Sequence, residues 1–199
     1  MSKLIIKNGA IIKDVQGIVL SDTTNLASAN YSVAEGLATV AAGDYSHAGG
    51  YGASSTSPGE WSRSTGIVGG AWFPQYGIID LAARTTSAAI TEIFVGGITN
   101  SRISLAPSQT MRFNFTALAV NESTGASKEW SGDGLIKSVG ATTSMVGSSN
   151  VSTYADASMA AVALGLAANN TNDAIYFEAV GLAATNIRWY VKVDYIYIV

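Results

Sequence analysis

The feature that most constrains the fold of this chain is a short repeat that begins at residue 31. Residues 31–39 and residues 45–53 align at a spacing of 14 positions. The positions that they share carry an aromatic residue, small residues or glycine: Tyr31 and Tyr45, Ser32 and Ser46, Ala34 and Ala48, Gly36 and Gly50. Chance similarity in a segment rich in Ser, Ala and Gly is the alternative, but the matches keep the same order in both copies, which favours a true repeat.

A weaker third copy follows the first two. Its matches are Gly59-Glu60-Trp61-Ser62 with Gly43-Asp44-Tyr45-Ser46, and Gly66 with Gly50, with Ser57-Pro58-Gly59 as a turn-like insertion. A short repeat of this kind predicts a β-solenoid, because small side chains let successive coils stack closely and glycine forms the corners. Three coils bury little apolar surface, so they require a longer array or packing against other chains.

Composition limits the classes of function. Charged residues make up 13% of the 199 residues, about half the share of a typical soluble domain, and the formal charge is −3. The absence of cysteine excludes disulfides, thiolate metal sites and a cysteine nucleophile, and the single histidine, His47, excludes sites built from several histidines of one chain. Eleven Lys and Arg residues without a basic run argue against a nucleic-acid partner, and no apolar run predicts membrane insertion.

The N-terminal region is apolar and β-branched. We expect strands at 3–7, 10–14 and 17–21, with Asn8-Gly9 as the turn of a hairpin. Such a unit is too small to be stable alone, so residues 1–27 are predicted to pack on a partner. The start of the chain is too short and too interrupted for an export signal, which predicts synthesis in a cytoplasm without Sec-type export.

The rest of the chain is predicted to form strands after a connector at 67–84, which is rich in glycine and aromatic residues and is expected to hold loop and short strand. Residues 85–199 alternate between short runs and turn signals, which predicts an antiparallel, jelly-roll-like β-sandwich. The expected strands are 89–96, 101–106, 109–121, 127–131, 135–139, 143–148, 158–166, 174–182 and 187–198. Gly132-Asp133-Gly134 is among the expected turns, and residues 155–168 could be helix or strand, with alternation favouring strand.

The last expected strand has the clearest period of two. Ile187, Trp189, Val191, Val193, Tyr195 and Tyr197 share one face, which makes Trp189 a core residue. Arg188, Lys192 and Asp194 fall on the other face. We therefore expect the few charges of the chain to gather on outward faces.

The repeat resembles two known families. Asn30-Tyr31-Ser32-Val33-Ala34-Glu35-Gly36 is similar to the head repeat of trimeric autotransporter adhesins, and Gly43-Asp44-Tyr45-Ser46-His47-Ala48-Gly49-Gly50 is similar to the version found in bacteriophage fibre proteins. The segment from Val180-Gly181 to Trp189 resembles the closing strands of globular domains that end phage fibres. The chain departs from the adhesins in having about three coils, no export signal and no membrane-anchor barrel, which favours a phage virion protein.

The resemblance implies a homotrimer in which three left-handed β-rolls pack about a threefold axis, and this would explain how so few charges suffice. It implies repeat and trimer packing for a set of residues within 31–61: Tyr31, Ser32, Ala34, Gly36, Tyr45, Ser46, His47, Ala48, Gly50 and Trp61. His47 is expected to be a packed repeat residue, with an ion held by three copies on the axis as the alternative.

Catalytic sites are hard to build from this sequence. Ser46 and His47 are neighbours that would point to opposite faces of a strand, and no Gly-x-Ser-x-Gly elbow occurs. A glycosidase needs two carboxylates about 5–10 Å apart. The candidates by residue type are Glu122, Glu129, Asp133, Asp156 and Asp173. All lie in or beside turn-like segments, as do the oxygen ligands of a conceivable calcium site, so we expect no enzyme, no cofactor and no metal.

Aromatic residues near expected loops are the best binding candidates, because exposed rings stack on sugars. They are Trp61, Trp72, Phe73, Tyr76, Trp130 and Tyr154. Packing between subunits is the favoured role for Trp61, Trp72 and Phe73, and the candidate receptor contacts are Trp130 and Tyr154.

These observations predict an all-β, homotrimeric, non-enzymatic fibre protein of a phage virion. Residues 1–27 would attach it to other virion proteins, residues 28–66 would form a β-roll stalk, and residues 85–199 a distal knob. The knob is expected to bind a host-surface glycan or receptor. The alternative is a head fibre, capsid decoration or tail-assembly protein whose knob contacts other virion proteins.

Overall fold

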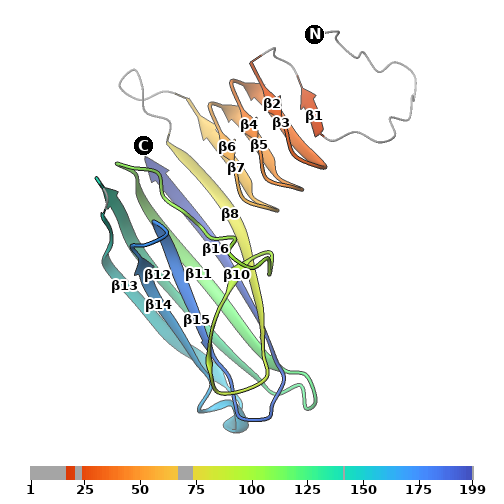
Figure 1. Ribbon diagram of the computed structural model, residues 1–199, viewed down its shortest axis with the longest axis vertical. Helices are drawn as coiled ribbons and strands as arrows, with labels where there is room; N and C mark the ends of the chain where they lie inside the picture. Colours follow the sequence, from red (N-terminus) through yellow and green to blue (C-terminus); the bar gives the residue numbers. More distant parts are fainter. Residues whose placement is uncertain (1–16, 21–23, 67–73, 141, 199) are drawn as a thin grey trace, which may run out of the picture.

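The computed structural model describes residues 17–20, 24–66, 74–140 and 142–198, and in these the protein is all-β, as predicted. The described regular structure outside the strands is one 3-10 turn, η1 (Ala157–Met159). A stack of short parallel strands lies at one end of the elongated molecule, and a domain of two facing antiparallel sheets lies at the other (Figure 1). The expected hairpin at 3–7 and 10–14 lies outside the described residues.

The repeat forms stacked coils with two rows of parallel strands. One row runs in the order β1 (Gly17–Leu20), β3 (Ser32–Leu37), β5 (His47–Tyr51) and β7 (Trp61–Thr65). The other row runs in the order β2 (Leu26–Ala27), β4 (Val40–Ala41) and β6 (Ser54–Ser55). The space between the rows is filled by alanine and serine side chains, because only small groups fit where two short strands of one coil face each other. Ala34, Ala41, Ala48 and Ala53 form this narrow core.

The spacing of 14 residues continues without interruption through the third coil. His47 pairs with Trp61 and Ala48 with Ser62, so the predicted insertion at Ser57-Pro58-Gly59 is wrong. The corner residues of the coils explain the difference. Tyr31, Tyr45 and Gly59 occupy equivalent places and share a left-handed backbone, with φ of 55°, 60° and 69°. The corner therefore aligns Tyr45 with Gly59, whereas residue similarity had aligned Tyr45 with Trp61.

The antiparallel domain contains a large sheet and a small one. The large sheet continues directly from β7 in the order β8, β16, β11, β12 and β13, with β10 also pairing with β8. These strands are β8 (Gln75–Thr85), β10 (Phe94–Val95), β11 (Thr110–Asn121), β12 (Ser127–Val139), β13 (Thr142–Ala155) and β16 (Ile187–Ile198). The small sheet has the order β14 (Ala163–Asn169), β15 (Ala174–Val180) and β9 (Ile90–Glu92).

The core lies between these two sheets and depends on aromatic pairs. Phe115 of the large sheet meets Phe177 of the small sheet edge to face, with ring centroids 5.2 Å apart. The indoles of Trp130 and Trp189 stack at 5.5 Å within the large sheet, which confirms Trp189 as a core residue. Stacked and edge-to-face rings at these separations add to the energy of burial.

The expected turn at Gly132-Asp133-Gly134 is wrong, because β12 runs through it as a continuous strand. Gly132 lies opposite Phe115, and Gly134 lies opposite Phe113. A Cβ at Gly134 would lie 2.4 Å from the Phe113 ring. These glycines therefore make room for the phenylalanine rings of the neighbouring strand.

Other strand boundaries also differ from expectation. Residues 75–85 form one long strand where the connector was expected to hold loop and short strand, because β8 has a hydrogen-bonded neighbour on each side. Residues 101–106 contribute an isolated bridge at Ser104 and no strand. Within 155–168, a turn and η1 precede β14, so the expected strand begins only at Ala163.

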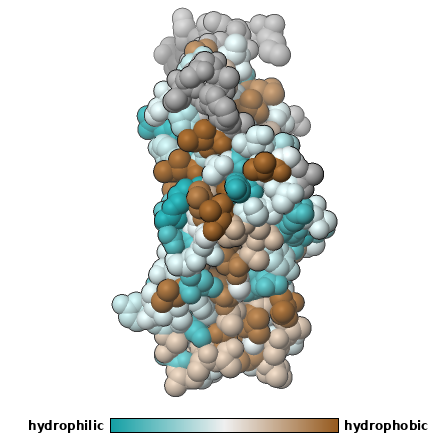
Figure 2. Space-filling model, turned by 90° about the vertical axis from the view of Figure 1, so that its left-hand side faces the viewer, coloured by the Kyte–Doolittle hydropathy of each residue, from teal (hydrophilic) through white to brown (hydrophobic). Residues whose placement is uncertain are grey.

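The outer face of the large sheet carries the charges predicted for it. Lys192 and Asp194 form an ion pair of 3.0 Å there, and Arg188 pairs with Glu122 at 2.9 Å. Apolar side chains are also exposed on this face, among them Leu118 and Tyr190, which lie opposite each other in the register. Figure 2 shows apolar and hydrophilic residues interleaved along one side of the molecule.

A buried polar network joins the coils to the antiparallel domain. The Glu60 carboxylate accepts hydrogen bonds from the backbone N–H groups of Thr56 and Ser57 and from the Tyr195 hydroxyl. The Gln75 side chain bonds both backbone polar groups of Ser54, at 2.7 and 2.8 Å. Satisfied polar groups of this kind position two elements more specifically than apolar contact alone.

We expect Glu60 to make stability depend on pH. Burial raises the pKa of this carboxyl above its usual 4.5, outweighing the hydrogen bonds from Tyr195, Ser57 and Thr56, which lower it. The folded state then holds the proton more tightly than the unfolded state, so the Glu60 contribution to stability falls as pH rises from about 4.5 through the raised pKa. Denaturant unfolding of the wild type and of Glu60→Gln between about pH 4 and 8 measures this.

The stability of wild type minus that of the glutamine variant should decrease with pH. The subtraction removes the opposite contribution of Glu122, whose pKa is lowered to about 2 by Arg84 and Arg188. Parallel curves for the two proteins would contradict the assignment.

Candidate functional site

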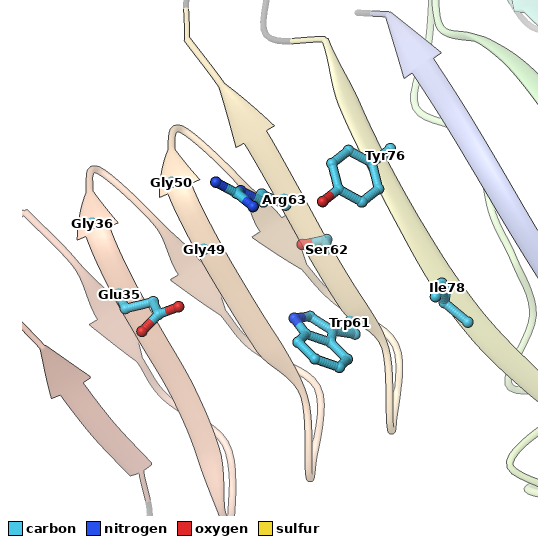
Figure 3. Close-up of a pocket in the computed structure, with 9 residues that line it drawn as sticks. All are labelled: Glu35, Gly36, Gly49, Gly50, Trp61, Ser62, Arg63, Tyr76 and Ile78. Carbon is cyan, nitrogen blue, oxygen red and sulfur yellow. The ribbon is translucent and has the colours of Figure 1, made fainter.

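A hollow of about 670 Å³ opens where the coil strands meet β8 (Figure 3). It lies on the outer face of β3, β5, β7 and β8, away from the alanine core of the coils. The residues that line it are Glu35, Gly36, Gly49, Gly50, Trp61, Ser62, Arg63, Tyr76 and Ile78. We call it the junction groove.

The register of the sheet explains why the groove is there. Glu35, Gly49, Arg63 and Tyr76 lie opposite one another on four successive strands and form one row across the sheet. Gly49 has no side chain, so the row has a gap between Glu35 and Arg63. The backbone of Gly49, which carries no side chain, therefore forms the floor of the groove.

The neighbouring row provides an aromatic wall. His47, Trp61 and Ile78 lie opposite one another on β5, β7 and β8. The imidazole of His47 stacks on the indole of Trp61 with centroids 5.5 Å apart, which holds the indole in place. Trp61 is still 61% exposed and Tyr76 is 47% exposed, so two aromatic side chains face solvent at one site.

The groove contains two charged groups, of which, in the described part of the chain, Glu35 lies near a possible partner and Arg63 does not. The Glu35 carboxylate lies 3.1 Å from Nε2 of His47. Among the residues that the structure describes, no hydrogen-bond acceptor or carboxylate pairs with the exposed Arg63 guanidinium, although other arginines such as Arg84 and Arg102 pair with glutamates. The groove thus combines two exposed rings, one unpaired cation and a carboxylate that lies beside the His47 imidazole.

The residues predicted to pack the repeat divide into three groups. Ser32, Ala34, Ser46 and Ala48 are buried between the strand rows of the coils. The rings of Tyr31 and Tyr45 stack on each other at 5.3 Å on the surface. The remaining members lie at the groove: Gly36, Gly50, His47 and Trp61. Whether any of them contacts another copy of the chain stays a prediction.

Of the two candidate receptor contacts, the structure exposes one. Tyr154, on β13, is 74% exposed. Trp130 is only 4% exposed because its ring packs on Trp189, so it cannot reach a receptor, and this prediction is corrected. Trp72 and Phe73 lie outside the described residues.

Sequence reasoning included Trp61 and Tyr76 among its aromatic candidates, with packing between subunits favoured for Trp61, but missed Glu35, Gly49 and Arg63. The repeat could have identified these three residues, because they are separated by the coil spacing of 14. With the third copy displaced by a supposed insertion, Arg63 did not fall in line with the other two.

The carboxylates considered for catalysis are all engaged in hydrogen bonds. Glu122 pairs with Arg84 and Arg188, and Asp133 pairs with Arg112 at 2.5 Å. The other partners are Thr153 for Glu129, Ser127 for Asp156 and Thr143 for Asp173. In the part of the chain that the structure describes, no group of three His, Cys, Asp or Glu residues could hold a metal ion. No described helix is long and apolar enough to cross a membrane.

Comparison with known proteins finds a remote similarity to solved structures of phage tailspikes. No protein-family model and no curated protein matches the sequence. Among solved structures, the chain is similar to tailspike protein gp49 of Acinetobacter baumannii bacteriophage Fri1, a capsular polysaccharide depolymerase, with 12% identity and a TM-score of 0.35 over 84% of this chain. It is also similar to the tailspike of Acinetobacter phage vB_ApiP_P1, with 18% identity and a TM-score of 0.24 over 58% of this chain. The chain spans 28% and 20% of the lengths of those proteins.

This comparison contradicts one expectation from the sequence. The chain was predicted not to be an enzyme, whereas the Fri1 protein that it resembles is a depolymerase. The prediction rested on the absence of a recognisable catalytic motif, and it is not retained.

Two adjacent glycines of the groove should respond differently to alanine. Gly50 has φ of +92°, and a Cβ there would lie 2.0 Å from the carbonyl oxygen of Ser64, so Gly50→Ala should lower the free energy of unfolding by more than about 2 kcal/mol. Gly49 has ordinary backbone geometry, and its nearest neighbour would be the Glu35 carboxylate at 3.4 Å. Gly49→Ala should therefore change stability by less than about 1 kcal/mol in denaturant unfolding. Equal losses in both variants would contradict this account of the coil.

Proposed function

We propose that the chain is a structural, receptor-binding component of a phage virion that assembles as a homotrimer and binds a host-surface glycan through its antiparallel domain. The observation that carries the proposal is the architecture: a stack of short parallel coils that passes into a two-layered β-domain within one continuous sheet. Such a molecule is extended, and it presents its two ends to different partners. The match to tailspike structures agrees with this proposal but adds no independent weight to it.

Each successive segment of the chain is proposed to have a separate role. Residues 1–27 attach to other virion proteins, residues 28–66 form a stalk and residues 85–199 form the distal knob, with 67–84 between them. Strand β8 gives this arrangement rigidity, because it pairs with β7 of the stalk on one side and with β16 of the knob on the other.

The homotrimer is supported by surface composition. Only 13% of the residues are charged, and the face that carries Leu118 and Tyr190 exposes apolar side chains in the middle of a sheet. Apolar surface of this kind is stabilised when copies of the chain cover it.

Glycan binding by the knob is supported by strand β13. This strand is an edge of the large sheet, and its residues 147–155 are exposed. They include Ser148, Ser149, Asn150, Ser152, Thr153 and Tyr154, which offer hydroxyl and amide groups beside an aromatic ring. Hydrogen-bonding side chains beside an exposed ring suit a sugar surface.

A second candidate is a head fibre, capsid decoration or tail-assembly protein. The long exposed edge of β13 favours it, because an edge strand can pair with a strand of another virion protein. Cryo-electron microscopy of the intact particle separates the two functions. A knob covered by other virion proteins supports this candidate, and a free distal knob supports glycan binding.

Light scattering tests the homotrimer. The chain has a mass of 20.5 kDa, so the trimer should have a mass of about 60 kDa. Leu118→Arg places a charge on the exposed apolar face and should shift the mass toward the monomer, whereas Ser123→Arg, in the exposed turn between β11 and β12, serves as the control. A wild-type mass of about 20 kDa would contradict the assembly.

Binding to host cells tests the knob. Tyr154→Ala should weaken binding by about tenfold, since the loss of an exposed ring removes a stacking surface without altering the core. Val139→Ala is the control, because Val139 is also an exposed side chain of the knob but lies at the end of β12 opposite to Glu129, the partner of Tyr154. The assay should also follow the release of reducing ends, which reports cleavage of the glycan. Equal binding of both variants and the wild type would contradict the role of Tyr154.

A further inference from the structure

We propose that the junction groove binds a carboxylated saccharide unit, such as a uronic acid residue of an acidic polysaccharide. The proposal rests on the proposed function for the source of the saccharide, but it assigns a second site, at the opposite end of the sheet from Tyr154 and built by different strands. The site is formed by β3, β5, β7 and β8.

The unpaired cation points to an anionic ligand. Arg63 is exposed and has no carboxylate partner among the described residues, while the nearest acid in its row, Glu35, lies beyond the gap at Gly49 and contacts His47. A guanidinium group presents a planar fork of donors that matches the two oxygens of a carboxylate. The ligand carboxylate would therefore lie beside the Arg63 guanidinium, on its side away from Glu35, with the sugar ring toward Gly49.

The exposed rings point to a sugar. Trp61 and Tyr76 lie on adjacent strands and flank Arg63, and Figure 3 shows them on the same side of the sheet. Stacking against His47 restrains the Trp61 indole, so little side-chain entropy is lost when a ring packs on it. A flat, partly apolar sugar face fits such a surface, and the groove of about 670 Å³ is in the range of small-molecule sites.

Glu35 makes the site selective. Its carboxylate faces the gap from the side opposite Arg63, with a Cβ at Gly49 falling only 3.4 Å from Oε1. It can accept hydrogen bonds from sugar hydroxyls, and it repels a second carboxylate. The ligand is thus a ring with an acid group on one side and hydroxyls on the other, which describes a uronic acid.

Binding is tested on the full chain with a panel of carboxylated oligosaccharides. The probes are galacturonate, hyaluronan and sialyllactose oligosaccharides, each compared with a neutral analogue: the methyl ester of the galacturonate, a chitin oligosaccharide and lactose. We expect saturable binding of at least one carboxylated probe and binding at least about tenfold weaker for its neutral analogue. Absence of binding to every carboxylated probe, or equal binding of acid and neutral forms, would overturn the proposal.

Three variants locate the binding. Arg63→Met should weaken it by about tenfold or more because it removes the charge but keeps an unbranched side chain. Gly49→Leu should block it by filling the gap, since the backbone at this position accepts a side chain. Arg188→Met is the matched control: it removes the same charge from the far end of the sheet, where Arg188 pairs with Glu122, and should bind as the wild type does. Unchanged binding in Gly49→Leu would overturn the proposal.

Two further outcomes separate this proposal from the proposed function. In the first outcome, no carboxylated probe binds, Gly49→Leu binds host cells as the wild type does, and Tyr154→Ala does not. This result would refute the saccharide site in the groove and support the proposed function. In the second outcome, the groove binds its probe but the full chain does not bind host cells. This result would refute the proposed function and support the saccharide site in the groove. A fall in molecular mass for Trp61→Ala would show that the groove is a contact between copies of the chain and would overturn the saccharide site.

Discussion

The carboxylate of Glu60 is the point on which the arrangement of the two halves depends. In the first two coils the equivalent position is a buried serine, Ser32 or Ser46, and the third coil replaces it with a buried acid. A buried carboxylate is stable only when its oxygens are bonded, and here the donors are backbone groups of the coil and the hydroxyl of Tyr195. The coil itself bonds Oε2 of Glu60, and joining the coil stack to the antiparallel domain supplies the Tyr195 hydroxyl as the donor for Oε1.

The same uniform spacing that stacks the coils also builds the groove. Parallel strands repeat every 14 residues, so residues at this spacing form straight rows on the outer face. When one member of a row is glycine, its neighbours are left around a gap, as Glu35 and Arg63 are around Gly49. The groove is therefore a consequence of coil register and of a single missing side chain.

Much of the fold could be predicted from the sequence. The errors arose where a residue packs against a partner on another strand. Alternation located β11 and β16 to within a residue, because one buried face and one exposed face leave a period of two. The glycines at 132 and 134 were taken for a turn, since glycine is a strong turn signal, yet they accommodate rings from β11. Trp130 was taken for a surface aromatic because its packing partner, Trp189, is distant in sequence.

The sequence by itself determined that this protein is all-β, that its N-terminal part repeats with small buried residues, and that the charges of its last strand lie on an outer face. Periodicity carries that information because it reports which face of each strand is buried. Only the tertiary structure decided which strands are neighbours. It therefore decided that Glu60 bonds Tyr195, 135 residues away, and that Arg63 lies opposite Tyr76 on β7 and β8. A period does not specify the partner of a strand, because that choice depends on long-range packing and on buried polar groups that must find their donors.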